Sequence, residues 1–262
     1  MQPLAQQIKE VLAGLAVGPF GENVHVYERV GSTNDVLKEM ATQGAPEGTL
    51  VIADEQTAGR GRMGRAWVAP PQSSLLMSIL FRPALLPQQV YRLVMACGLA
   101  VAEACEAEEG IPPVEVKWPN DLLIGGRKFT GILPESAFIG EQLAWVVVGI
   151  GVNVNQTFEA SDALAATATS LRAVSGHEHN RAALLAHILE RLSHWHRHLL
   201  DDALPDAWRG RCMTLGQRVR VGTPQGVLEG LAEAVDENGM LWLRDATGQH
   251  HRISAGEATL LV

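Results

Sequence analysis

Apolar residues recur at helical spacing in two long segments of the chain. From Gln88 to Glu108 they follow the i, i+3, i+4 pattern of an amphipathic helix, on a face made of Val90, Leu93, Val94, Cys97 and Val101. A second helix is predicted over Asn180–Leu200, with Asn180 as its N-cap. A shorter helix is predicted to begin at Ser32 or Thr33 and to end near Thr42.

Between these helices lie short, nearly continuous apolar runs that are typical of buried strands. The predicted strands are Val24–Val30, Thr49–Ala53, Ser74–Phe81, Val114–Trp118, Lys128–Pro134 and Trp145–Val154. Strands that lack polar–apolar alternation indicate a central sheet that is covered on at least one face. The Ala/Thr-rich stretch Ala160–Ala168 is interpreted as a loop.

The pattern changes after Arg211, where short strands follow one another about ten residues apart. These strands are Gln217–Val221, Gly226–Val235, Met240–Arg244 and His250–Ile253, with a hairpin turn at 237–239. We therefore predict two domains: a larger domain over residues 1–212 and a small all-β barrel over residues 213–262. The fold class is α+β, with a mixed central sheet and packed helices in the larger domain.

Composition and charge narrow the classes of function. The chain has 262 residues, is 47% hydrophobic and carries a net charge of −8. An acidic protein does not bind nucleic acid or an anionic membrane over its whole surface, so any anion must meet a local basic patch. Three cysteines without a pairing pattern favour a reducing compartment. The longest apolar run, Leu143–Val152, is too short to span a bilayer, and we expect a cytoplasmic protein.

The first 23 residues precede the first predicted strand. A helix-turn-helix domain needs two or three packed helices, so this segment offers no room for one. We therefore expect no DNA partner and no membrane partner.

An arginine–glycine loop over 59–67 is the most informative segment. It contains Gly-x-Gly-x-x-Gly, but prolines 70 and 71 block the helix that a dinucleotide-binding loop requires. It also lacks the Lys-Ser/Thr of a phosphate-binding Walker loop. Residues 56–102 contain no carboxylate, and their arginines are Arg60, Arg62, Arg65, Arg82 and Arg92. Guanidinium groups among glycines favour binding of phosphate or carboxylate, although a solvated basic loop with a core-packed Trp67 is the alternative.

The loop offers few apolar side chains to bury, so we expect it to be mobile until an anion orders it.

Other segments have both structural and functional interpretations. The polar run Ser32-Thr33-Asn34-Asp35 can cap a helix as a capping-box-like pair, or it can hydrogen-bond a neutral ligand. Lys117–Asp121 ends in a turn, and Lys128 alone would be a surface lysine. Glycines 149 and 151 lie in a strand pattern, which marks the close approach of a ligand or of another backbone. His194 and His198 stand at i, i+4 beside the core face of a predicted helix, but no carboxylate or cysteine completes a zinc ligand set there.

Five motifs occur together in a fixed order: Ser32-Thr33-Asn34, Glu55–Trp67, Lys117-Trp118-Pro119-Asn120-Asp121, Lys128–Leu133 and Gly149–Asn153. This set resembles the biotin–protein ligases, specifically the short form without an N-terminal DNA-binding domain. The resemblance runs from about Val24 to the end of the chain. Met63 and Pro134 depart from common family residues, but neither carries an assigned role. The resemblance implies a class II synthetase-like catalytic domain with a small C-terminal SH3-like β-barrel.

The resemblance also implies an activity and its partners. Such an enzyme activates biotin with ATP, which brings Mg²⁺, as biotinyl-5′-adenylate. It then transfers biotin to a lysine of a biotin carboxyl carrier protein, and the resemblance allows a homodimer. A lipoate or octanoate transferase shares this fold and is the nearest alternative. A non-catalytic biotin sensor is the alternative from another class, but it would not need Lys128 and Asp121.

Family roles carry over onto residues of this chain as expectations. The implied biotin-binding set is Ser32, Thr33, Asn34, Gln56, Gly59, Arg60, Gly61, Arg62, Lys128 and Gly131. The implied ATP-binding set is Arg60, Arg62, Arg65, Trp67, Lys128 and Asn153, with Trp67 stacked on adenine and Asn153 at its edge. The implied catalytic residues are Lys128, Arg62 and Asp121, and no metal is assigned to protein ligands. Because a carboxylate must approach a phosphate, preorganised positive charge is the main resource such a site needs.

Overall fold

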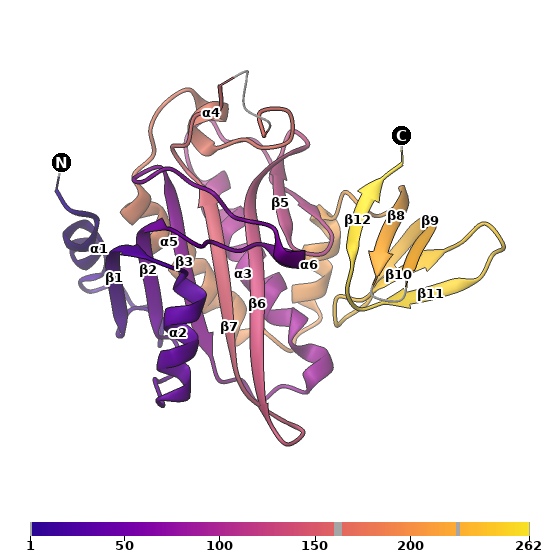
Figure 1. Ribbon diagram of the computed structural model, residues 1–262, viewed down its shortest axis with the longest axis horizontal. Helices are drawn as coiled ribbons and strands as arrows, with labels where there is room; N and C mark the ends of the chain where they lie inside the picture. The colour runs from indigo at the N-terminus through magenta and orange to yellow at the C-terminus, as the bar shows by residue number, and fades with distance from the viewer. Residues whose placement is uncertain (1, 160–163, 224–225, 262) are drawn as a thin grey trace.

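A computed structural model describes residues 2–159, 164–223 and 226–261 (Figure 1). A seven-stranded sheet forms the centre of the larger domain, with the strand order β1-β2-β3-β7-β6-β5-β4. Its strands are β1 (Val24–Val30), β2 (Leu50–Gln56), β3 (Ser74–Phe81), β4 (Glu115–Lys117), β5 (Asp121–Ile124), β6 (Arg127–Ile139) and β7 (Gln142–Asn153). β1 and β2 run parallel and the other neighbours run antiparallel, which confirms the predicted mixed sheet.

The sheet is covered by helices on both faces. The helices of the larger domain are α1 (Leu4–Leu12), α2 (Thr33–Thr42), α3 (Tyr91–Glu106), α4 (Leu171–Ser175), α5 (Arg181–Arg197) and α6 (Ala203–Arg211), with short 3-10 turns at Arg62–Gly64 and Pro87–Gln89. α2 packs on β2, β3 and β7, while α3 and α5 pack together on the opposite face (Figure 1). Adjacent residues of β2 show the two faces, because Val51 joins the core under α2 and Ile52 joins the main core.

The predicted helices are confirmed to within a few residues. Asn180 caps α5 as predicted, since its side chain accepts hydrogen bonds from the backbone N–H groups of Ala182 and Ala183. The patterns missed α4, α6 and β5. α4 has only 5 residues, and α6 begins with a proline in its first turn. Of the predicted loop over 160–168, residues 164–167 form turns, and 160–163 lie outside the described residues.

The C-terminal strands form the small antiparallel β-domain that the sequence predicts. They are β8 (Arg218–Thr223), β9 (Gly226–Val235), β10 (Leu241–Arg244), β11 (His250–Ile253) and β12 (Glu257–Leu260), in the order β11-β10-β9-β8-β12. β12 was not predicted. The expected boundary after residue 212 lies between α6 and β8.

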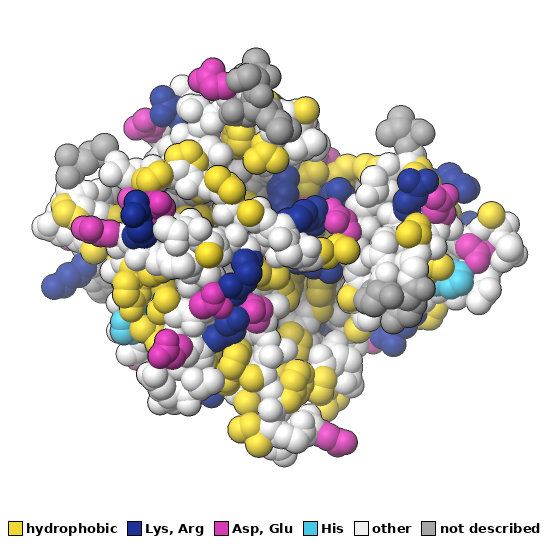
Figure 2. Space-filling model, viewed as in Figure 1, with side chains coloured by type: hydrophobic (Ala, Val, Ile, Leu, Met, Phe, Trp, Pro, Cys, Tyr) yellow, Lys and Arg dark blue, Asp and Glu magenta, His cyan; other side chains and the backbone are white. Residues whose placement is uncertain are grey.

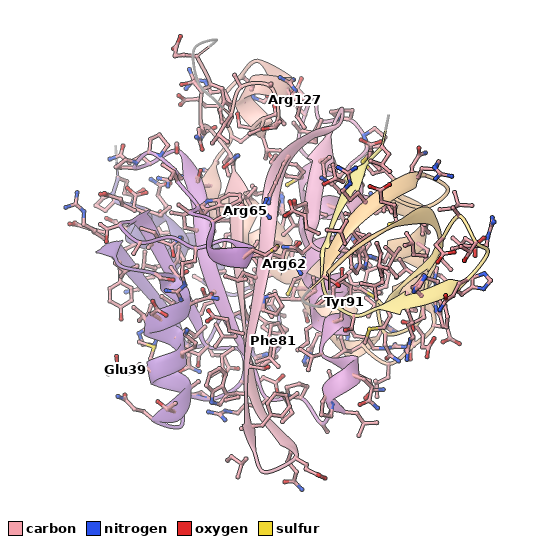
Figure 3. All side chains as sticks on the ribbon, turned by 45° about the vertical axis from the view of Figure 1, so that its right-hand side comes forward. Glu39, Arg62, Arg65, Phe81, Tyr91 and Arg127 are labelled. Atoms are coloured by element: carbon pink, nitrogen blue, oxygen red, sulfur yellow. The ribbon has the colours of Figure 1, made fainter. Side chains whose placement is uncertain are left out.

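The β-domain is docked against the larger domain near the turn that follows β4. Trp118 donates its indole N–H to the carbonyl oxygen of Gly239 at 2.9 Å, and the Tyr91 ring lies directly against the same glycine. Figure 3 shows Arg62 and Tyr91 close to this seam. β12 therefore lies within reach of the arginine–glycine loop.

The described part of the chain contains no helix that is long and apolar enough to cross a membrane. All three cysteines are buried free thiols.

Candidate active site

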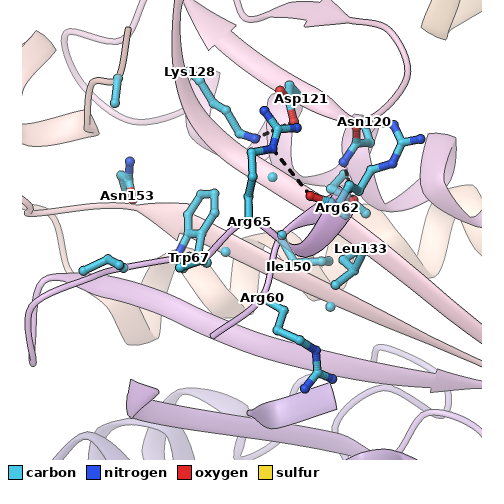
Figure 4. A pocket seen from close by; sticks show the side chains of 18 of the residues that line it. Arg60, Arg62, Arg65, Trp67, Asn120, Asp121, Lys128, Leu133, Ile150 and Asn153 are labelled. Carbon is cyan, nitrogen blue, oxygen red and sulfur yellow. Dashed lines mark hydrogen bonds and ion pairs between the residues drawn. The ribbon is translucent and has the colours of Figure 1, made fainter. Parts of the chain in front are cut away.

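A cavity of about 500 Å³ opens between the arginine–glycine loop, the start of α2, strands β5 to β7 and the segments 156–158 and 164–168 (Figure 4). A volume of this size is typical of small-molecule sites. With one exception, every residue that the sequence assigned to the site lines this cavity: Ser32, Thr33, Asn34, Gln56, Arg60, Gly61, Arg62, Arg65, Trp67, Asp121, Lys128, Gly131 and Asn153.

Gly59 is the exception, because it lies at the base of the loop and not on the cavity wall. Its carbonyl accepts a hydrogen bond from the backbone N–H of Trp67 at 2.9 Å. A Cβ at this position would lie 2.5 Å from the Trp67 carbonyl oxygen. The glycine is therefore required for close backbone packing within the loop.

One end of the cavity is neutral, polar and buried. Gln56 Oε1 accepts hydrogen bonds from the backbone N–H of Thr33 at 2.8 Å and from its hydroxyl at 3.1 Å. Gln56 thus accepts hydrogen bonds from the first turn of α2, whereas the Ser32 side chain makes no capping hydrogen bond. The capping-box interpretation of Ser32 and Asp35 is wrong at Ser32, and this buried hydroxyl is left facing the cavity.

Asn34 is fully engaged with protein groups. Its Nδ2 donates to Glu135 Oε2 at 2.7 Å and to the Leu133 carbonyl at 3.3 Å, and its Oδ1 lies 2.6 Å from Ser78 Oγ. Gly149 leaves the space for this side chain, since a Cβ there would overlap Asn34. Asn34 therefore positions this wall of the cavity, and it offers a ligand little free hydrogen-bonding capacity. The sequence missed Ser78, whose only signal is a serine within an apolar strand.

Arg60 points away from the other cations of the site (Figure 4). Its guanidinium makes two hydrogen bonds of 2.6 Å to Asp35, and Glu135 lies 3.6 Å away. Lys38 joins both carboxylates, at 3.0 Å and 2.7 Å. We call these four residues the Arg60 latch. Figure 2 shows such a mixed cluster of basic and acidic side chains in the middle of the visible face.

The latch has two consequences. The hydrogen bond from Arg60 holds the pKa of Asp35 well below its ordinary value, so the carboxylate stays charged at neutral pH. The guanidinium is also engaged on the α2 side, so this geometry does not support the predicted contact of Arg60 with ligand phosphates.

Arg62 and Arg65 extend toward the cavity and have other partners. Arg62 donates to Asn120 Oδ1 at 3.1 Å, and partial burial lowers its pKa. Arg65 pairs with Glu257 of β12 at 2.7 Å. The sequence missed the roles of Asn120 and Glu257. The loop has polar anchors that the sequence did not reveal, because each of its three arginines has a partner.

Two of the five arginines counted in the sequence are structural. Arg82 donates to the carbonyls of Ala41 and Ala45, and Arg92 donates to the carbonyl of Leu199. The basic patch is therefore smaller than the count suggested.

Lys128 supplies a cation at the middle of the cavity. Its Nζ lies 2.6 Å from Asp121 Oδ1 and 5.6 Å from the centroid of the Trp67 ring. Lys117, which the sequence did not select, also lines the cavity and is the strand partner of Asp121. A paired and partly buried lysine, in a cavity that a second lysine also lines, can hold an anionic ligand in place.

The far end of the cavity is aromatic. The Trp67 indole lies flat on the sheet because Gly131 and Gly151 lack side chains, and a Cβ on either would approach the ring to 2.9 Å or 2.6 Å. Asn153 donates to the Thr169 carbonyl at 3.1 Å, which leaves its Oδ1 buried without a partner among the described residues. A planar ligand with hydrogen-bond donors on its edge fits this end.

The cavity thus joins a neutral polar end, a cationic middle and an aromatic end. Its lining includes two carboxylates, Asp121 and Glu257, and each is ion-paired. Among the residues that the structure describes, no group of three or more His, Cys, Asp or Glu could hold a metal ion. The arrangement can bring two anionic groups together between a polar ligand head and a planar base.

Comparison with known proteins agrees with this geometry. Residues 26–153 match the biotin/lipoate A/B protein ligase family, and residues 214–261 match the biotin protein ligase C-terminal domain. The biotin–[acetyl-CoA-carboxylase] ligase of Mycobacterium tuberculosis is 36% identical over 98% of this chain and 95% of its own length. The bifunctional ligase/repressor BirA of Bacillus spizizenii is 35% identical over 91% of this chain and 74% of its own length.

Solved structures extend the likeness to three dimensions. The biotin protein ligase of Aquifex aeolicus in complex with biotin and ATP is 29% identical to this chain, with a TM-score of 0.76. The match covers 92% of this chain and 99% of that protein. A point mutant of the same protein in complex with biotin, also 29% identical, gives a TM-score of 0.77 over 92% of this chain and 98% of its own length.

Proposed function

This chain belongs to the biotin protein ligase family, and from that membership we propose the reaction its cavity performs. It forms biotinyl-5′-adenylate from biotin and ATP, releases pyrophosphate, and transfers the biotinyl group to a lysine of a biotin carboxyl carrier protein. One observation carries the proposal: a single cavity has a neutral polar end and an aromatic end, with Lys128 between them. That order matches a ureido ring, a carboxylate beside a phosphate, and an adenine.

The polar end is proposed to bind the biotin ring system. Ser32, Thr33 and Gln56 supply hydroxyl and amide groups to a neutral cyclic urea, and the loop backbone at Gly61 closes over it. Asn34 keeps this wall in shape through Ser78 and Glu135. Because buried polar groups are costly without partners, a ligand with donors and acceptors is favoured over a plain hydrocarbon there.

The cationic middle is proposed to catalyse adenylation. A biotin carboxylate oxygen attacks the α-phosphorus of ATP, the bond to the β-phosphate oxygen breaks, and pyrophosphate leaves. Lys128 and Arg62 stabilise the negative charge that gathers between carboxylate and phosphate, and Arg65 holds the leaving phosphates. Since the described residues offer no carboxylate cage for a metal ion, we propose that Mg²⁺ arrives with ATP.

The second step needs a neutral amine. The carrier lysine attacks the acyl carbon of the mixed anhydride, AMP leaves, and the amine gives up a proton. Asp121 stands at the cavity with 19% of its side chain exposed and is paired with Lys128. When Lys128 turns to the adenylate, Asp121 is released to attract the incoming lysine and to accept its proton.

Several further assignments belong to this proposal. We propose a cytoplasmic enzyme that acts without DNA, in line with the net charge of −8. A sequence-selective gel shift at physiological salt and nanomolar protein would contradict the DNA part. A homodimer is a further proposal, and sedimentation at several concentrations measures it.

The experiment that tests the activity is pyrophosphate release. With MgATP, release should require biotin, and lipoate or octanoate should not substitute, because the polar end is shaped by hydrogen-bonding groups. Equal turnover with lipoate or octanoate would assign the chain to the lipoate-type transferases of the same fold.

A further inference from the structure

The segment that follows β7 carries a second amide toward the same end of the cavity. Gln156 lies three residues after Asn153 and lines the same cavity as Asn153 and Trp67. The sequence did not select it, and the roles proposed above do not use it.

Backbone bonds hold this segment firmly. Asn155 N–H donates to the Ser73 carbonyl at 2.6 Å, Ser170 Oγ donates to the Gln156 carbonyl at 2.6 Å, and Arg172 N–H donates to the Val154 carbonyl at 2.9 Å. Asn155 turns away from the cavity, because its side chain makes two hydrogen bonds of 2.9 Å to the backbone of His179. The backbone from 153 to 156 is therefore held in place by contacts that do not involve a ligand.

Both of these amides present a buried oxygen. Asn153 is 6% exposed and Gln156 is 8% exposed. The Thr169 carbonyl accepts from Asn153 Nδ2, and this fixes the amide so that Oδ1 is the free end. Neither Asn153 Oδ1 nor Gln156 Oε1 has a hydrogen-bond partner among the described residues. Unpaired buried acceptors are rare in folded proteins and need an explanation such as a ligand.

The ligand that satisfies two neighbouring acceptors must bring donors. The cations of the site lie on one side of Trp67, so the phosphates of a nucleotide lie there and its base lies toward 153–156. The exocyclic amine of adenine has two N–H groups, whereas guanine has a carbonyl at that carbon. We propose that Gln156 is a specificity-determining residue that accepts a hydrogen bond from the adenine amine, alongside Asn153. This inference rests on the proposed adenylation.

Two substrates and three variants test it. Biotin-dependent pyrophosphate release is measured as kcat/KM with ATP and with purine riboside triphosphate, which lacks only the amine. The wild type should prefer ATP, and Gln156→Met should shrink that preference about tenfold, mainly by slowing the reaction with ATP. Gln156→Glu keeps an acceptor oxygen and should retain most of the preference. Asn155→Ala, next to it but outside the cavity, should leave the preference unchanged.

The alternatives separate clearly. If Gln156→Met slows both substrates equally, the residue only packs, and the inference is overturned. If the wild type uses the two triphosphates equally well, the amine is not recognised and the inference is overturned while the ligase activity stands. If biotin and ATP give no pyrophosphate at all, the proposed function fails and the inference fails with it.

Discussion

Replacing Lys128 by alanine removes the cation that the account places between the two reacting anions. In the structure the lysine Nζ is 2.6 Å from Asp121 and lines the middle of the cavity. We expect Lys128→Ala to slow adenylate formation strongly. Transfer from preformed biotinyl-adenylate should suffer less, because the two anions are by then already joined.

The magnitude follows from distance and exposure. Two unit charges about 4 Å apart interact by about 4 kcal/mol at an effective dielectric constant of about 20. Solvent reaches 34% of the Lys128 side chain, so we reduce this to about 3 kcal/mol. At about 1.4 kcal/mol per factor of ten, the rate should fall about 10²-fold.

The variant also leaves Asp121 without its partner. An unpaired carboxylate repels the carboxylate and phosphates of the substrates, so Asp121→Asn added to Lys128→Ala should restore part of the adenylation rate. This recovery is specific to an electrostatic role, since a packing defect would not be repaired by a second substitution.

Single-turnover formation of adenylate, measured separately from transfer to a carrier domain, is the assay. Arg127→Ala is the matched control, because it removes an exposed neighbouring cation and should leave both steps near normal. Near-normal adenylation by Lys128→Ala would refute the reasoning, and so would an equal loss in Arg127→Ala.

Four other predictions follow from the loop and its surroundings. Arg62→Gly should loosen the loop over the intermediate, so that adenylate escapes and labels bystander lysines, and mass spectrometry of a mixed protein sample should find this labelling above wild type. Asp35→Asn should release Arg60, which should raise the KM for biotin a few-fold and expose the loop to trypsin at Arg60. An unchanged KM and an unchanged digestion pattern would show that the Arg60 latch does not hold the loop. The pKa of Asp35 lies below its ordinary value of 3.8. The stability that its ion pair contributes is therefore present at neutral pH and is lost only as the pH falls through that lower pKa. Protection of the wild-type loop from trypsin should accordingly not vary between about pH 6 and 9. Gly151→Ala should push the Trp67 ring off the sheet, since its Cβ would lie 2.6 Å from the ring, and weaken ATP binding in calorimetry more than biotin binding.

Much of the fold followed from the sequence because its strands and long helices have strong patterns. Ser74–Phe81 is mostly apolar and was predicted with its observed bounds. The pattern did not predict α6 because a proline and a glycine lie within it. In the folded chain, tertiary packing outweighs the poor helix propensity of these two residues. β5 was not predicted because it has only 4 residues and begins at Asp121, where the sequence was interpreted as a turn.

The members of the site could be predicted, but their partners could not. The motifs assigned Lys128 and Trp67 to one site, and both line the same cavity. The partners of the arginines are distant in sequence: Asp35 lies 25 residues from Arg60, and Glu257 lies 192 residues from Arg65. No local pattern encodes such pairs, since they depend on how α2 and the β-domain dock. Ser78 and Gln156 were missed for a similar reason, because a single polar residue gains a role only through its three-dimensional neighbours.

The transfer of biotin to a carrier protein tests the proposed ligase function most directly. The pure protein is incubated with biotin, MgATP and a biotin carboxyl carrier domain, and the intact carrier and its peptides are weighed by mass spectrometry. We expect one added biotinyl group, on one lysine, only when both biotin and ATP are present. A carrier that stays unmodified, or that gains its label equally well from lipoate, would contradict it.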